Sequence, residues 1–250
     1  MKHNFFFILI YISISFQSCT KKLDCINCKD KNVFSVLVIT ETDDFIHKSI
    51  DSGVLMVKNI GDKNNFNVYH SSNSRVLSSK NLKNISTIIF LNTSENILNI
   101  FEQKIMEKFI KSGRGFVGIH AAADTEYDWP WYGRLVGAFF RSHPDGTTLA
   151  KIKKVNTDNK IIKHIDSIWE IEDEWYNFDF TDSDITVLLN LDEESYEGGE
   201  NGDYHPITWF HDFDGGRSFY TGLGHLEETF KDEKFIELVK NGILYTSFRD

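Results

Sequence analysis

The chain has 250 residues, of which 41% are hydrophobic and 14% aromatic, and this is enough to build one substantial core. Its 37 acidic residues outnumber its 27 Lys and Arg residues and give a formal net charge of -10. This charge repels a phosphate backbone and leaves no basic stripe, so nucleic acid is excluded as a partner.

The N-terminal residues have the features of an export signal. Lys2 precedes the apolar run FFFILIYISISF, which is too short to span a bilayer as a helix of about 20 residues. The run leads into FQSC, which resembles a bacterial lipoprotein signal whose lipid is attached to Cys19. We therefore predict a signal peptide over residues 1–18, a lipidated tether over residues 19–32, and anchoring in the cell envelope, on the periplasmic side or at the cell surface. An ordinary secretory signal is the alternative, and it too would export the chain.

Two cysteines, Cys25 and Cys28, lie in the predicted tether. One C-x-x-C pair offers only two metal ligands and is equally compatible with a local disulfide in an oxidising compartment. No cysteine follows Cys28, so the predicted domain, residues 33–250, has no thiol nucleophile.

The first half of this domain has the pattern of an α/β protein. Short β-branched apolar runs over residues 33–40, 85–92 and 115–120 are typical of strands buried on both faces of a parallel sheet, and residues 66–71 form a more polar strand. Residues 97–110 have a helical apolar stripe, with Gly113 as the stop. Alternating strands and helices predict a doubly wound, mostly parallel sheet with helices on both faces.

The second half predicts antiparallel strands. Residues 147–155 alternate between apolar and polar, and residues 184–192 form another strand. Asp214, Gly215 and Gly216 indicate a tight hairpin turn, and an amphipathic helix ends the chain. Residues 193–204 are acidic and rich in glycine, which predicts an exposed loop.

Histidines mark the predicted carboxyl ends of the strands, where ligands collect in such sheets. His120 ends the third strand before three alanines, His47 follows the first strand, and His143 ends the next loop. Imidazoles in such positions can bind a metal or transfer protons. A structural role is the alternative for each of them, but three converging on one face favour function over core filling.

Aromatic and acidic side chains surround these histidines in the sequence. Tyr127 and Trp131 alternate with acidic residues such as Asp124, and flat rings beside carboxylates suit a sugar ring. Packing of the tryptophans onto the sheet is the alternative. If WEIEDEWYNF is a strand, Glu172 and Glu174 share a face, and one of them is a candidate general base or metal ligand; we take Glu174 as the catalytic candidate, and a solvated acidic run without function is the alternative. His225 ends a later strand.

Four segments together resemble the ThuA-like (trehalose utilisation) family over residues 33–248: FIHKSI, GFVGIHAAADTEYDWPWYGRLVGAFFRSHP, DEWYNF and HPITWFHDFDGGRSFYTGLGH. The resemblance implies a flavodoxin-like fold of the class I glutamine amidotransferase type. In amidotransferases of that fold a cysteine occupies the turn at which this chain has His120. Without that thiol, glutaminase activity is excluded. The resemblance also implies a sugar-related substrate, including keto-disaccharides.

The sequence therefore supports two hypotheses. The first is an extracytoplasmic enzyme acting on keto-glycosides or related sugars by acid/base or metal-assisted chemistry, as a lyase, hydrolase or isomerase. Its catalytic residues would be His120, His143 and Glu174, and a zinc-like divalent ion would be held by His47, His120 and His143. Substrate contacts would come from Asp124, Tyr127, Trp131, Arg141, Tyr176 and His225. The second is a non-catalytic sugar-binding or scaffold lipoprotein whose histidines are structural.

Overall fold

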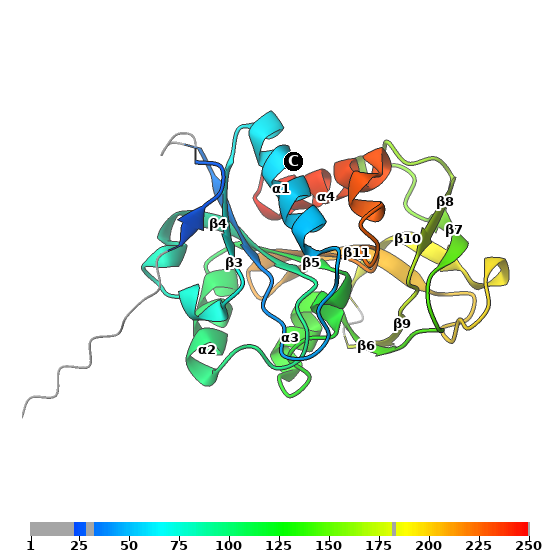
Figure 1. Ribbon diagram of the computed structural model, residues 1–250, viewed down its shortest axis with the longest axis horizontal. Helices are drawn as coiled ribbons and strands as arrows, with labels where there is room; N and C mark the ends of the chain where they lie inside the picture. The colour runs from blue at the N-terminus through cyan, green and yellow to red at the C-terminus, as the bar shows by residue number, and fades with distance from the viewer. Residues whose placement is uncertain (1–22, 29–32, 182–183, 250) are drawn as a thin grey trace, which may run out of the picture.

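The computed structural model describes residues 23–28, 33–181 and 184–249. Its main feature is a ten-stranded sheet with the order β1-β3-β2-β4-β5-β12-β11-β10-β7-β8 (Figure 1). Helices cover the parallel part, and the antiparallel part extends to one side. This confirms the predicted α/β class with a flavodoxin-like, mostly parallel core and an antiparallel hairpin extension. The predicted signal peptide, Cys19 and most of the tether lie outside the described residues.

Five neighbouring strands pair in parallel and form the centre of the sheet. They are β2 (Ser35–Ile39), β3 (Asn67–Ser71), β4 (Ile85–Leu91), β5 (Gly115–Ile119) and β12 (Gly216–Thr221). Every residue of β2 and β5 is buried, which explains why these runs are apolar without alternation. The order β3-β2-β4-β5-β12 is the flavodoxin-like order. Its topological switch point lies between β2 and β4, because β3 is added on one side of β2 and the later strands on the other.

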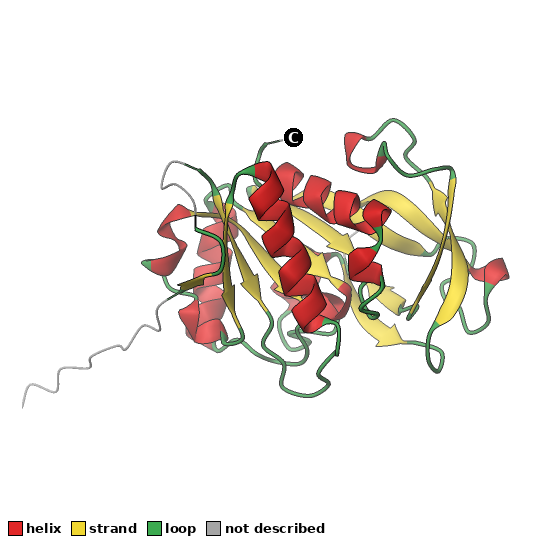
Figure 2. Cartoon of the chain, turned by 45° about the horizontal axis from the view of Figure 1, so that its top comes forward, coloured by secondary structure: helices red, strands yellow, loops and turns green. Residues whose placement is uncertain are grey.

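Helices cover both faces of these strands. They are α1 (Ile50–Asn64), α2 (Ile100–Lys111), α3 (Pro130–Val136) and α4 (Glu233–Thr246). The alternation of side chains along β4 separates the layers, because Phe90 contacts Tyr132 of α3 whereas Leu91 lies against Gly53 of α1. Figure 2 shows α1 and α4 as long helices packed along the sheet.

Local signals set the helix ends. Asn99 and Glu102 form a capping box at the start of α2, so this helix begins three residues after the predicted start at Ile97. Gly113 follows its end with a φ of 84°, as the predicted stop requires. Residues 124–143, which read as an aromatic loop, contain α3. The described residues also contain six short 3₁₀ turns: η1 (Ser74–Val76), η2 (Asn81–Asn84), η3 (His120–Ala123), η4 (Lys160–Ile162), η5 (Glu193–Ser195) and η6 (Thr229–Lys231).

The antiparallel extension grows from β12. A tight turn at Asp214 and Gly215, both with positive φ, joins β12 to β11 (Pro206–Phe213) as the hairpin signal predicted. Three more antiparallel strands follow: β10 (Thr186–Asp192), β7 (Thr148–Lys154) and β8 (Ile168–Asp173). A separate sheet of β6 (Ala138–Ser142) and β9 (Asn177–Phe180) was not predicted.

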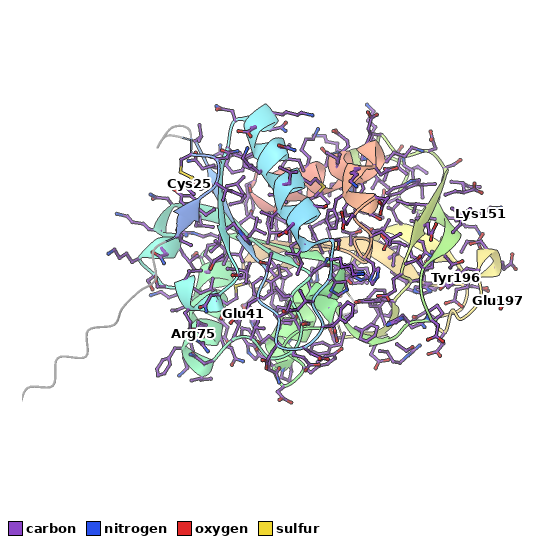
Figure 3. All side chains as sticks on the ribbon, viewed as in Figure 1. Cys25, Glu41, Arg75, Lys151, Tyr196 and Glu197 are labelled. Atoms are coloured by element: carbon purple, nitrogen blue, oxygen red, sulfur yellow. A yellow bond between two sulfur atoms is a disulfide. The ribbon has the colours of Figure 1, made fainter. Side chains whose placement is uncertain are left out.

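The opposite edge of the main sheet carries the predicted tether. The two-residue strand β1 (Asp24–Cys25) pairs with β3, and Cys25 forms a disulfide with Cys28. Figure 3 shows Cys25 at one end of the molecule and Lys151, Tyr196 and Glu197 at the other. Among the helices of the described ranges, none is both long and apolar enough to cross a membrane.

Candidate metal centre

His120 occupies the sharp turn at the carboxyl end of β5. Its backbone has a φ of 50°, and its carbonyl accepts a hydrogen bond from the Tyr220 hydroxyl at 2.8 Å. The ring is fully buried, with Nδ1 2.7 Å from the carbonyl oxygen of Gly222. Because a carbonyl only accepts, Nδ1 carries the hydrogen and Nε2 presents its lone pair. That Nε2 atom is buried without a hydrogen-bond partner.

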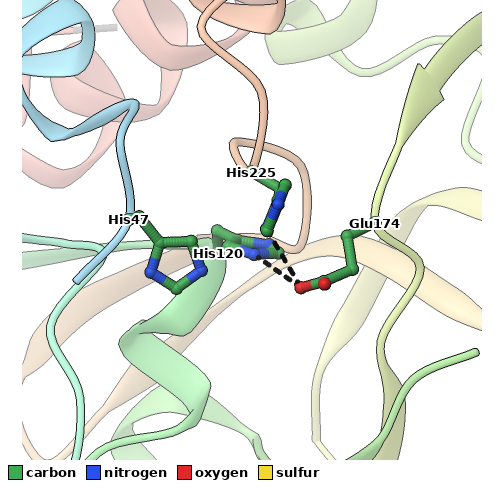
Figure 4. Close-up of side chains that lie close together, drawn as sticks. All are labelled: His47, His120, Glu174 and His225. Carbon is green, nitrogen blue, oxygen red and sulfur yellow. Dashed lines mark ion pairs between the residues drawn. The ribbon is translucent and has the colours of Figure 1, made fainter. Parts of the chain in front are cut away.

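Three further side chains meet His120 at this edge of the sheet. His47 comes from the loop between β2 and α1, Glu174 directly follows β8, and His225 follows β12 (Figure 4). One ligand atom from each of the four residues lies within 4.8 Å of all the others. We call these four residues the His₃Glu cluster. The structure thus brings together two of the three predicted metal ligands, His47 and His120, with two residues that were predicted for other roles.

The carboxylate of Glu174 lies at the middle of the contacts. Its Oε2 atom is 3.1 Å from Nδ1 of His225 and 3.4 Å from Nε2 of His120. Its Oε1 atom is 3.5 Å from Nδ1 of His143, the third predicted metal ligand. His143 therefore borders the cluster, and its side chain remains 36% exposed whereas that of Glu174 is 9% exposed.

The pKa shifts of His47 and Glu174 favour the deprotonated forms that bind a cation, whereas that of His225 favours its protonated form. Burial, followed by the charges of His120 and His225, lowers the pKa of His47 to about 2, so its imidazole is neutral. Burial raises the pKa of Glu174, but the proximity of His120 and His225 outweighs burial and holds that pKa well below its ordinary value. Burial lowers the pKa of His225, yet its contact with Glu174 gives a net increase.

The donor set identifies the kind of ion that fits. Three imidazole nitrogens and one carboxylate oxygen are ligands typical of zinc and similar transition metals, whereas magnesium and calcium prefer oxygen alone. The buried and unpartnered Nδ1 of His47 and Nε2 of His120 are the atoms that such an ion would satisfy. Four protein ligands would fill a tetrahedral zinc site, so a substrate oxygen would have to add as a fifth ligand.

Asp173 supports the cluster from behind, and the sequence pattern did not mark it. This fully buried carboxylate accepts hydrogen bonds from the backbone N–H groups of Glu174, Gly224 and His225 and from the Thr229 hydroxyl, all at 2.9 Å. It fixes the backbone of two cluster residues at once. An acidic residue that precedes a ligand at the end of a strand, and so points to the other face, is the signal that could have revealed it.

The fold places the predicted substrate-binding residues in different parts of the molecule. The Tyr176 ring lies 4.2 Å from the His120 ring and forms a wall of the site. Tyr127 donates a hydrogen bond of 2.5 Å to Asp124, whose pKa is raised to about 6, chiefly by burial. Arg141 forms ion pairs with Asp179 and Glu200.

Trp131 lies elsewhere. Its ring packs against Phe213, and its Nε1 donates to Asp214 at the turn that precedes β12. The cluster lies beyond the other end of this six-residue strand, which is about 20 Å long at about 3.3 Å per residue. The structure therefore does not bring Trp131 to the cluster, and packing is the role that its contacts support.

The fold and the site define a flavodoxin-like α/β protein with imidazoles at the carboxyl edge of its parallel strands. A family model described as ThuA, trehalose utilisation, matches residues 35–246, so the chain belongs to the ThuA family. A comparison with curated proteins gives no match.

Solved structures share this fold. A ThuA-like protein from Bacteroides uniformis superposes with a TM-score of 0.72 at 22% identity, covering 88% of this chain and 94% of that one. A ThuA-like protein from Parabacteroides merdae gives 0.68 at 16% identity, with 86% and 90% covered. A β-galactosidase from Bacillus circulans gives 0.54 at 13% identity, with 84% of this chain and 30% of that chain covered. At these identities the similarities concern the fold alone.

Proposed function

We propose that this protein is a metal-dependent enzyme that acts on keto-glycosides or related sugar derivatives. The observation that carries the proposal is the His₃Glu cluster, whose four ligand atoms lie within 4.8 Å of one another with unpartnered nitrogens among them. Membership of a trehalose-utilisation family supports a carbohydrate-related role. A sugar binder needs aromatic surfaces but has no use for a buried group of imidazoles.

The turn after β5 supports chemistry other than acyl transfer. In this chain it presents His120, and the only two cysteines of the described residues, Cys25 and Cys28, are joined in a disulfide. A thiolate nucleophile is therefore absent from this part of the chain. The same turn presents an imidazole nitrogen to the cluster instead.

A divalent ion held by His47, His120, Glu174 and His225 would polarise the carbonyl oxygen of a keto-sugar and so acidify the neighbouring C–H bond. The proton of that bond would pass to His143. Its Nδ1 lies 2.8 Å from the carbonyl oxygen of Pro144, to which it donates, and this leaves Nε2 free as the base.

Asp124 would supply a proton later in the reaction. Its pKa, raised by burial to about 6, keeps part of its population protonated near neutrality. After His143 takes the carbon-bound proton, the C–H electron pair forms an enolate. If a glycosidic oxygen on the next carbon leaves with its bonding pair and takes the proton of Asp124, the result is elimination. If the proton returns to a different atom, the result is isomerisation.

The proposal includes a location outside the cytoplasm with a lipid on Cys19. The signal-like sequence over residues 1–18 supports it, and so does the Cys25–Cys28 disulfide, because such bonds persist in oxidising compartments. Metabolic labelling with a fatty acid should mark the full chain and not its Cys19→Ala variant. Equal labelling of the two proteins, or none of either, would contradict the anchor.

The test of the enzyme is metal content together with turnover. The purified domain should contain about one equivalent of a transition metal and convert a 3-keto-glycoside. His120→Ala should lose both properties, whereas the control His164→Ala should keep both, because the Nε2 atom of His164 contacts Lys234 O at 2.9 Å, away from the cluster. A metal-free wild type, or a His120→Ala protein with unchanged turnover, would refute the proposal.

A further inference from the structure

Phe45 is an exposed aromatic side chain on a loop that is itself held in place. The loop joins β2 to α1 and pairs with the loop after β4 through a bridge between Thr42 and Ser94. Asp43 N–H donates to the carbonyl oxygen of Ser94, and the Ser94 hydroxyl donates to that of Phe45, both at 3.3 Å. With its backbone fixed in this way, Phe45 remains 56% exposed.

The Phe45 ring touches the His₃Glu cluster. It meets the His47 ring edge to face at a centroid distance of 4.7 Å, and it lies nearly parallel to the His225 ring at 6.5 Å and 17°. His47, by contrast, is 4% exposed. A ring more than half exposed contributes little to core packing. Its position between two cluster imidazoles and solvent makes it part of the rim of the site.

Hydrogen-bond acceptors accompany this ring. Asp44 is its neighbour in the sequence, and the negative charges of Glu95 and Asp44 contribute to the raised pKa of Asp124 after burial, the main cause. Carboxylates from three neighbouring loops therefore lie close to one another. An exposed apolar ring with carboxylates in its own and the neighbouring loops suits a pyranose, which has a C–H face and a rim of hydroxyl groups.

We infer that Phe45 determines specificity, as the stacking platform for the sugar ring that neighbours the reacting ring. The inference rests on the proposed function for the placement of the first ring. A reacting ring has to lie over the four ligand atoms, and Phe45 borders two of those imidazoles, so its free face meets the neighbouring ring. Stacking there would select a disaccharide over a free monosaccharide.

The test compares trehalose with glucose as binding probes by calorimetry on the zinc-loaded protein. Neither sugar carries a keto group, so binding is measured without turnover. Phe45→Ala should weaken trehalose binding about 10-fold, an effect of the size of one aromatic stacking contact, and leave glucose binding unchanged. Phe45→Tyr should bind like the wild type. The control Ile46→Ala removes an adjacent apolar side chain that is 70% exposed and should change neither affinity.

Three results would overturn the inference: a Phe45→Ala protein with wild-type affinity for trehalose, equal losses for the two sugars, or a zinc-loaded wild type that binds trehalose no better than glucose. The proposed function is judged separately, by the metal content and keto-glycoside turnover of the same preparations. Selective loss of trehalose binding in a protein that never turns over keto-glycosides would refute the enzyme and support the platform. Turnover of keto-glycosides, together with a trehalose affinity that Phe45→Ala leaves unchanged, would support the enzyme and refute the platform.

Discussion

Replacing Asp173 by Asn tests whether this buried carboxylate organises the metal centre. Its Oδ1 accepts from the N–H groups of Glu174 and His225, and its Oδ2 accepts from Gly224 N–H and the Thr229 hydroxyl. An asparagine has one acceptor oxygen. Its least costly orientation keeps the oxygen on Glu174 and His225 and turns the amide toward Thr229, which can accept instead of donate. Gly224 N–H then loses its partner.

The expected loss of stability follows from the hydrogen bonds that Asp173→Asn loses or weakens. One unpaired buried N–H costs about 1–3 kcal/mol, and the two remaining bonds lose the strength that a charged acceptor adds. Removal of a buried charge offsets part of the loss. We expect Asp173→Asn to destabilise the metal-free protein by about 2–3 kcal/mol, which lowers the melting temperature by roughly 5–10 °C in a chain of this size. Zinc affinity should fall about 10- to 100-fold, as for other residues that orient ligands.

Urea unfolding of the metal-free proteins and competitive zinc titration measure the two effects. Asp166→Asn is the matched control, because Asp166 is exposed and forms an ion pair with Lys234 at the surface, so neither quantity should change. An Asp173→Asn protein that unfolds at the wild-type urea concentration and binds zinc equally well would show that the four hydrogen bonds do not organise the site.

The remaining predictions concern the ion, the packing and the pH response. Zinc at 100 times its dissociation constant should stabilise the folded protein by about 2.7 kcal/mol, and a chelator should reverse the rise in melting temperature. Gly115→Ala should destabilise by at least about 1–3 kcal/mol in urea unfolding, because the added methyl would lie 2.2 Å from the carbonyl oxygen of Thr246 in α4. Trp131→Ala should lower the melting temperature and leave sugar binding intact, since its contacts are with Phe213 and Asp214. Burial raises the pKa of Asp124 from 3.8 to about 6, so its ionisation between these values costs folding stability. Asp124→Asn should therefore stabilise the protein at pH 7 by about 1 kcal/mol, after allowance for solvent screening, and have little effect at pH 4; an equal effect at both values would contradict this account.

The parallel half of the fold was predictable because its strands are buried on both faces. Such strands are continuous apolar runs, and their connections leave few alternatives for the topology. The carboxyl-edge rule then placed His47 and His120 together, since both follow parallel strands of one sheet. The same rule applies to His225, which follows β12, although no sequence pattern favoured it over His143 as a ligand.

The antiparallel half was less predictable because its register depends on packing between distant segments. Glu174 reaches the cluster only because β8 is the last strand of an extension that runs through β11, β10 and β7, and no local pattern specifies that order. Trp131 illustrates the opposite case, since the structure places it away from the cluster. Its sequence neighbours include acids and aromatics suited to a sugar, but the helix α3 turns its ring toward the hairpin. Side-chain direction in a short helix cannot be read from composition.

The turn at His120 shows how one backbone geometry can serve different chemistry. A left-handed residue between a parallel strand and the following helical turn presents its side chain at the carboxyl edge of the sheet, whatever that side chain is. A thiol there would be a nucleophile, but an imidazole needs its tautomer fixed before it can be a ligand. The carbonyl of Gly222 does this by accepting from Nδ1, and the loop that carries Gly222 also carries His225. Asp173 then holds that loop and the residue next to it, Glu174. Because one short segment after β12 orients two cluster imidazoles and is held by a carboxylate beside the fourth cluster residue, changes in that segment should affect metal binding more than equal changes at His143.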